Sequence, residues 1–146
     1  MGKRRKGREI VLQSFYASQI SGASLLDTLG DQLTRRESAD ETSEFAKDLG
    51  NKVSINEAEL KRWLGNLVSG NWDVKRLGVL ERSILTMGLA ELKYSPDVPY
   101  KVAINEALEL TRRYCDEGAV GFVNGVLDRA ASQMNPKPTA EDGEPR

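Results

Sequence analysis

The chain has 146 residues, of which 39% are hydrophobic, and a formal net charge of −1, a composition typical of one ordinary globular domain. It contains no histidine and one cysteine, which excludes Ser-His-Asp triads, histidine metal ligands and an internal disulfide. No apolar run approaches the ~20 residues of a membrane helix, and the first eight residues lack the apolar core of a signal peptide, so we expect a cytoplasmic protein.

Basic residues are concentrated at the start of the chain. Five of the 21 basic residues precede the first acid, and the remaining 16 face 22 acidic residues. A basic arm, residues 1–8, therefore precedes an acidic body. Such a run is a common electrostatic feature of nucleic-acid binding, although many charged termini only increase solubility, and composition alone leaves both interpretations open. The five residues are Lys3, Arg4, Arg5, Lys6 and Arg8.

Acidic residues show no arrangement that indicates catalysis. They are scattered along predicted helices and alternate with basic residues, which favours solvated faces over a paired-carboxylate site. The sequence also contains no glycine-rich phosphate-binding motif and no CxxC motif. We therefore expect no enzymatic activity, no metal and no cofactor.

Hydrophobic spacing at the start of the chain predicts two helices. The first begins within the basic run and continues to Ser21, and Gly22 ends it. Its predicted inward face consists of Leu12, Phe15, Tyr16 and Ile20. A shorter helix follows from an N-cap at Ser24, with Leu26, Leu29 and Leu33 inward, and residues 34–40 form a polar connection.

Residues 41–69 keep a single helical phase, which predicts one long helix. The segment 54–57 (SINE) has the form of a capping box, so a new helix start there is the alternative. We expect Gly70 and Asn71 to end this helix and Trp72 to pack in the corner that follows. Asp73 is the predicted N-cap of a helix over residues 74–94. Apolar residues occupy more than one face of this helix, so we expect it at the centre of the fold. The apolar residues of the long helix are Phe45, Leu49, Val53, Leu60, Leu64 and Leu67.

The apolar spacing of residues 99–127 predicts two neighbouring helices joined by a short turn, and Asp116 is the predicted N-cap of the second helix. Gly121 and Gly125 share one face of that second helix, which favours close approach of another helix backbone; the alternative is a bare face that admits a ligand or a second copy of the chain. The first apolar stripe is Ala103, Ile104, Ala107, Leu108, Leu110, Thr111 and Tyr114; the second is Ala119, Phe122, Val123, Val126, Leu127 and Ala130.

Because no segment alternates like a strand, these elements predict an all-α fold. We expect a compact single-domain bundle of six to seven helices over residues 9–134, in which two helical subassemblies, residues 1 to about 70 and about 71 to 134, share a core. The segment 135–146 has three prolines and no large apolar residue, which predicts a disordered tail.

Two hexapeptides, VAINEA at residues 102–107 and FVNGVL at residues 122–127, resemble the NusB family of transcription antitermination factors. Trp72, Arg76-Leu77, Glu81-Arg82 and the basic opening extend the resemblance from about Arg4 to Ala131. The resemblance implies a NusB-like, non-enzymatic RNA-binding domain. It further implies binding to boxA RNA of ribosomal RNA operons together with NusE, a small-subunit ribosomal protein, so that RNA polymerase reads through terminators and ribosomal RNA is synthesised.

The resemblance also implies functional residues. The five basic residues, Lys3, Arg4, Arg5, Lys6 and Arg8, would contact RNA, and Phe122 would stack on a base beside them. Tyr16 and Glu81 would face NusE. Without the resemblance, Phe122 is a core residue, Tyr16 a core-edge tyrosine and Glu81 a solvated partner of a basic residue. Gly121 stands where many relatives have lysine or arginine, which predicts weaker RNA binding.

Two other functions remain open at this stage. A NusB-like domain also precedes the catalytic domain of some ribosomal RNA cytosine methyltransferases, so the chain can be a non-catalytic accessory subunit of an RNA-modifying enzyme. We expect no such catalytic domain within residues 1–146, so activity would require a separate subunit. The second alternative is a structural homodimer formed through the face of Gly121 and Gly125.

Overall fold

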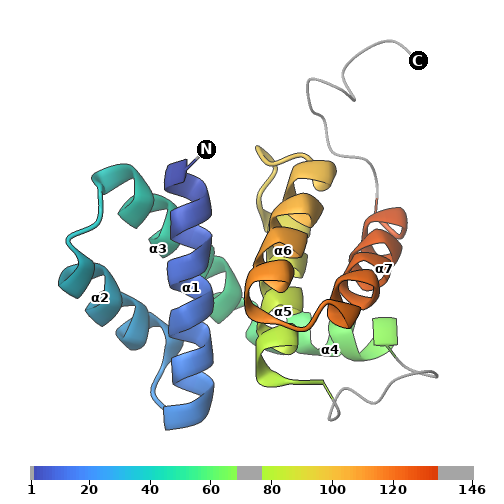
Figure 1. Cartoon of the computed structure of the whole chain (residues 1–146), viewed down its shortest axis with the longest axis horizontal. Helices are drawn as coiled ribbons and strands as arrows, with labels where there is room; N and C mark the ends of the chain where they lie inside the picture. Colours follow the sequence, from blue (N-terminus) through green and yellow to red (C-terminus); the bar gives the residue numbers. More distant parts are fainter. Residues whose placement is uncertain (1, 69–76, 135–146) are drawn as a thin grey trace. The chain divides into compact units, whose positions relative to one another are not determined.

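The computed structural model describes residues 2–68 and 77–134, and every regular element in those ranges is an α-helix (Figure 1). The all-α prediction is confirmed. Among the described helices, none combines the length and hydrophobicity of a membrane span. The predictions for Gly70, Asn71, Trp72, Asp73 and the tail 135–146 lie outside the described residues. The seven described helices are α1 (Gly2–Ser21), α2 (Leu25–Arg36), α3 (Asp40–Ile55), α4 (Glu57–Val68), α5 (Val79–Tyr94), α6 (Tyr100–Tyr114) and α7 (Gly118–Ser132).

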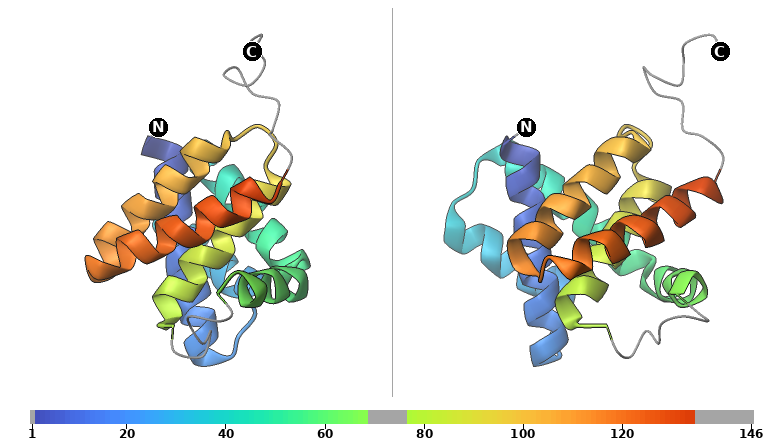
Figure 2. Two further views of the ribbon diagram at one scale, coloured as in Figure 1. Left: turned by 90° about the vertical axis from the view of Figure 1, so that its right-hand side faces the viewer. Right: turned by 45° about the vertical axis from the view of Figure 1, so that its right-hand side comes forward.

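The chain divides into two compact units between Glu57 and Ala58. In the first unit α1, α2 and α3 pack on one another. In the second, α5, α6 and α7 pack on one another, and Figure 2 shows α6 and α7 running side by side over α5. The predicted division near residue 70 is therefore wrong by one helix, because α4 belongs to the second unit.

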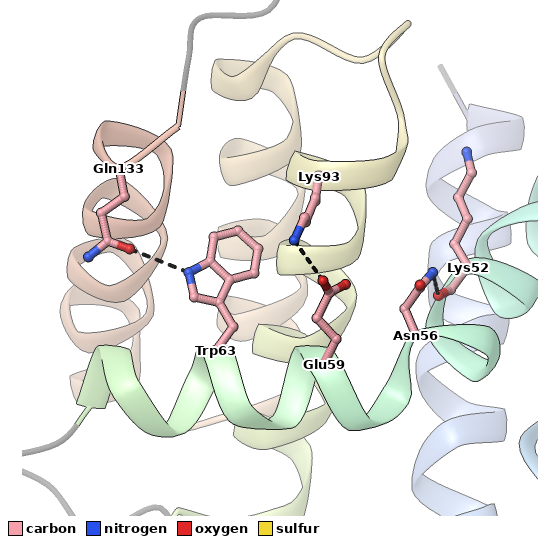
Figure 3. Close-up of polar contacts among 6 residues, drawn as sticks. All are labelled: Lys52, Asn56, Glu59, Trp63, Lys93 and Gln133. Atoms are coloured by element: carbon pink, nitrogen blue, oxygen red, sulfur yellow. Dashed lines mark hydrogen bonds and ion pairs between the residues drawn. The ribbon is translucent and has the colours of Figure 1, made fainter.

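Side chains connect α4 to α5 and α7. Trp63 Nε1 donates to Gln133 Oε1 at 3.4 Å, and Lys93 Nζ lies 2.9 Å from Glu59 Oε2 (Figure 3). The Arg129 guanidinium also donates to the Leu67 carbonyl. These contacts place α4 with the second unit although its sequence keeps the helical phase of α3.

The predicted continuous helix over residues 41–69 is interrupted at Asn56 (φ −108°, ψ 17°). The Asn56 side-chain amide donates to the Lys52 carbonyl at 2.8 Å (Figure 3). An asparagine that bonds backward in this way satisfies a carbonyl at a helix end and competes with helix continuation. The alternative helix start within residues 54–57 is therefore correct, and α4 begins at Glu57.

The caps predicted for α1 and α2 are confirmed. Gly22 has φ 83°, and its N–H donates to the Ser18 carbonyl at 2.9 Å, which ends α1. Ser24 Oγ accepts from Asp27 N at 3.1 Å at the start of α2. However, α2 continues to Arg36, and Glu37 follows in the left-handed region (φ 48°), so the polar connection contains only residues 37–39.

Two inward faces are rotated from those predicted. In α1, Leu12 and Phe15 are buried, but Tyr16 and Ile20 are 40% and 65% exposed. The small residues Ser14 and Ser18 occupy the buried positions instead. In α2, Leu29 and Leu33 are buried together with Leu25, whereas Leu26 is 40% exposed. Consecutive residues of a helix are about 100° apart around its axis, so the buried face that includes Leu25 leaves Leu26 at its side.

The second unit has α5 at its centre, as predicted, although α5 begins at Val79 instead of residue 74, after Gly78 in an extended conformation. The stripe of α6 is confirmed, with Tyr114 half-buried at its edge. In α7 the N-cap is Glu117, not Asp116, and no side chain caps the helix. Its buried residues are Val123, Val126, Leu127 and Ala130.

The close approach of α1 and α3 depends on Gly7. A Cβ atom at Gly7 would lie 2.9 Å from Phe45 Cδ1 and 3.3 Å from the Thr42 carbonyl oxygen. At Gly30, in the exposed face of α2, an added Cβ would meet nothing within 4 Å. Both glycines lie in helix interiors, where alanine is favoured by ~1 kcal/mol.

We predict that Gly7→Ala is less favourable than Gly30→Ala by about 1–3 kcal/mol in the free energy of unfolding, the usual cost of overpacking. Gly30→Ala should stabilise the protein, because it gains helix propensity without a clash. Urea unfolding followed by circular dichroism measures the difference. Equal effects of the two substitutions would show that Gly7 is not a packing constraint.

Candidate nucleic-acid interface

The five basic residues predicted to contact RNA lie in the first two turns of α1, which begins at Gly2. The expected boundary between an arm, residues 1–8, and the domain therefore falls inside a helix. Because residues three or four apart share a helix face, α1 distributes the five charges over different faces. Lys3, Arg4, Arg5 and Lys6 are exposed, whereas Arg8 is only 4% exposed.

Arg4 and Arg8 both lie over the ring of Phe45, on α3. Their guanidinium carbons are 5.3 Å and 4.8 Å from the ring centroid. Such cation–π contacts stabilise a guanidinium without neutralising its charge. Phe45 is half-buried, and its ring also packs against the position of Gly7. The basic turn is thereby fixed on α3, and Arg8 offers little surface to a ligand.

Lys3 and Lys6 line a hollow of about 920 Å³ between the start of α1 and the segment from the end of α2 into α3. Arg36, at the C-terminus of α2, lines the same hollow. Sequence reasoning assigned Arg36 to a polar connection and missed this role; the adjacent pair Arg35-Arg36 was the available signal. Lys3 Nζ also lies 3.8 Å from Glu41 Oε1, in an exposed ion pair.

Phe122 lies on α7 and is half-buried, so it belongs fully neither to the core nor to the surface. Gly121 and Gly125 beside it are exposed, and an added Cβ at either would meet nothing within 4 Å. The interpretation that these glycines admit another helix backbone is therefore wrong for the part of the chain that the structure describes. This face of α7 is open.

The two residues predicted to face NusE lie in different units. Tyr16 is exposed on α1, one turn before the exposed Ile20. Glu81 is half-buried in the first turn of α5, and its carboxylate lies so close to Gly78 that a Cβ there would clash with it. A carboxylate in this position compensates the positive end of a helix dipole. No lysine or arginine among the described residues pairs with Glu81, which argues against the solvated ion pair.

Glu81 also influences Cys115, in the turn between α6 and α7. Burial, together with the carboxylates of Glu81 and Asp116, which disfavour the thiolate, raises the pKa of the Cys115 thiol to about 11. The cysteine is consequently unsuited to act as a nucleophile near neutral pH. Within residues 2–68 and 77–134, no group of three Cys, Asp or Glu side chains is placed to hold a metal ion.

We predict that Glu81→Gln lowers the pKa of Cys115 below about 11, because removing the negative charge stabilises the thiolate. The pH dependence of iodoacetamide alkylation measures this pKa. Glu117→Gln is the matched control, since Glu117 is an exposed acid near the same turn that does not shift this thiol. An alkylation midpoint that is the same in wild type and Glu81→Gln would contradict the proximity of Glu81 to Cys115.

Comparison with known proteins identifies the family. The model of the NusB family matches residues 5–132. The transcription antitermination protein NusB of Myxococcus xanthus (strain DK1622) is 36% identical over 139 residues, which cover 92% of this chain and 99% of the relative.

Two solved structures have the same fold. The structure of T. maritima NusB matches with a TM-score of 0.84 and 28% identity, covering 92% of this chain and 94% of that chain. A chain in the crystal structure of antitermination factors NusB and NusE in complex with dsRNA matches with a TM-score of 0.83 and 24% identity, covering 92% and 99%. The family predicted from the two hexapeptides is confirmed: this chain belongs to the NusB family.

Proposed function

We propose that this chain is a non-catalytic transcription antitermination factor that binds boxA RNA together with NusE in the cytoplasm. RNA polymerase then reads through terminators in ribosomal RNA operons. The observation that carries the proposal is the exposed cationic turn of α1 in a chain of this family, whose relative in Myxococcus xanthus is an antitermination protein. The NusB and NusE structure in complex with dsRNA supports the choice of partners.

Phosphate contacts would come mainly from Lys3, Arg4, Arg5 and Lys6, because these side chains are exposed. Arg8 would contribute by holding Phe45 and, through it, the orientation of the basic turn. Cations on a fixed helix supply affinity for phosphates without reading sequence. Since the rest of the chain is acidic, it repels RNA, and we expect weak binding by the isolated chain.

Base recognition would involve Phe122. An aromatic side chain binds an unstacked base of single-stranded RNA through its ring face. The ring is half-buried, and the glycine positions beside it are open, so a base can approach without displacing a neighbouring side chain there. The absence of a basic residue at Gly121 weakens this contact and makes the partner more important.

The NusE surface would include Tyr16, with the exposed Ile20 beside it, and Glu81. Tyr16 and Ile20 are exposed one helical turn apart, and aromatic residues are enriched at protein interfaces. We expect NusE to add contacts to RNA and so to raise the affinity of the complex above that of the chain alone.

We predict that NusE tightens boxA binding, and that neutralising Lys3, Arg4, Arg5 and Lys6 flattens the salt dependence. Each phosphate contact contributes ~0.7 to the log–log slope on single-stranded RNA, so four contacts contribute about 2.8. Fluorescence anisotropy of labelled boxA RNA over a salt series measures both effects. The loss should be similar for scrambled RNA, because phosphate contacts carry no sequence information.

Two results would contradict the proposal. If NusE leaves the affinity for boxA unchanged, the two proteins do not bind RNA as a pair. If the neutralised variant keeps the wild-type slope, the basic turn only increases solubility. Circular dichroism of the variant shows whether α1 is retained.

We predict that Phe122→Ala weakens boxA binding more than binding to scrambled RNA. Loss of one base–aromatic stack costs ~1–3 kcal/mol. The cost in unfolding free energy should be smaller than the ~3–5 kcal/mol of a fully buried phenylalanine, because Phe122 is half-buried. Phe15→Ala, which removes a buried ring on α1, calibrates the thermal denaturation. Equal weakening on both RNAs, or a stability loss equal to that of Phe15→Ala, would make Phe122 structural.

A further inference from the structure

We propose that the hollow between α1 and the α2–α3 connection seats an RNA phosphate, with Arg36 as its third cation and Glu41 as a built-in competitor for Lys3. The proposal rests on the proposed function, since it extends the RNA path from the basic turn of α1. It assigns a role to two residues outside that turn.

The hollow brings together charges that are distant in sequence. Lys3 and Lys6 come from the start of α1, and Arg36 comes from the last residue of α2. The half-buried Ser38 also lines it. Three cations around a concave surface of about 920 Å³ form an anion-binding arrangement that neither α1 nor α2 supplies alone.

The Arg36 side chain is held in position before any ligand binds. Its Nε donates to Gln32 Oε1 at 3.2 Å, and its terminal nitrogen donates to Gln13 Oε1 on α1. A guanidinium has five N–H donors in a rigid fork, so two can bind glutamines while others remain for a phosphate. Fixing the side chain in advance reduces the entropy lost on binding.

Glu41 opposes this site. Its carboxylate pairs with Lys3 at 3.8 Å, and the two side chains are 71% and 58% exposed. An exposed ion pair of this length is weak, so a phosphate can take its place. Lys6, in contrast, forms no ion pair with any residue that the structure describes. Glu41 therefore lowers RNA affinity by neutralising one of three cations and by repelling the phosphate.

The observations favour RNA over an acidic protein surface. The hollow is continuous with the exposed cations of α1, which are the proposed phosphate contacts. The fork of Arg36 matches phosphate oxygens, and the hollow offers no exposed large apolar side chain of the kind that anchors a protein partner.

The test compares Arg36→Gln with Arg35→Gln in the full chain, using labelled boxA RNA with NusE present. Both arginines are exposed and carry the same charge, but only Arg36 lines the hollow. Arg36→Gln should reduce the log–log salt slope by ~0.7. The ratio of wild-type to variant affinity should therefore be about fivefold larger at 0.1 M salt than at 1 M salt. Arg35→Gln should change the affinity by less than twofold. Glu41→Gln should tighten binding about twofold to threefold. This change is opposite in direction to that of Arg36→Gln, and misfolding would not produce tighter binding.

The outcomes separate this inference from the proposed function. If wild type binds boxA with NusE but Arg36→Gln equals Arg35→Gln, the hollow is not a phosphate site and the proposed function stands. If Arg36→Gln weakens the capture of NusE in the absence of RNA, the hollow is a protein interface, and the inference is overturned. If wild type shows no salt-dependent RNA binding, both fail. Circular dichroism confirms that each variant is folded.

Discussion

The contact of α1 with α3 at Gly7 fixes the arrangement of the basic residues. Without a side chain at this position, the Phe45 ring and the Thr42 carbonyl approach the backbone of α1. Arg4 and Arg8 then lie over the same ring. Because a rigid helix determines where every other residue of the turn points, this contact also directs Lys3 and Lys6 toward Arg36. A flexible arm would leave the same charges without a common geometry.

In the second unit, burial determines which residues remain for binding. Helix α5 is apolar on several sides and packs against α6 and α7, which take their own apolar stripes inward. The opposite face of α7 is left with Gly121 and Gly125, and Phe122 lies at its edge. A glycine in a helix interior costs ~1 kcal/mol relative to alanine, and no packing contact in the described structure offsets it. An open face with an aromatic edge is consistent with selection for binding instead of stability.

Local signals in the sequence were sufficient for the all-α fold and for the caps at Gly22 and Ser24, whereas Asp116 is not the N-cap that was predicted for α7. Ser24, Gly22 and the stripe of α6 behave as their residue types predict, because these effects act within one or two turns. The helix break at Asn56 was only the alternative prediction, because the periodicity continues across it and favoured one long helix. In the structure the Asn56 side chain donates to the Lys52 carbonyl at this helix end. The site required tertiary information. Arg36 bonds to Gln13, 23 residues away, so the local pair Arg35-Arg36 indicated a cation but not its position. The packing at Gly7 involves α3, and no local pattern indicated it.

The charge arrangement explains why such a protein would depend on a partner. Sixteen basic residues outside the first turns face 22 acidic ones, so long-range electrostatics oppose RNA binding and only a small cationic surface favours it. Glu41 reduces that surface further by pairing with Lys3. Weak intrinsic affinity limits binding to the many non-specific RNAs of a cell, because non-specific binding is almost entirely electrostatic. In the proposed function, specificity would come from base stacking and from the second protein, which add to a small contribution from phosphate contacts. Both would be made together only at the correct RNA site.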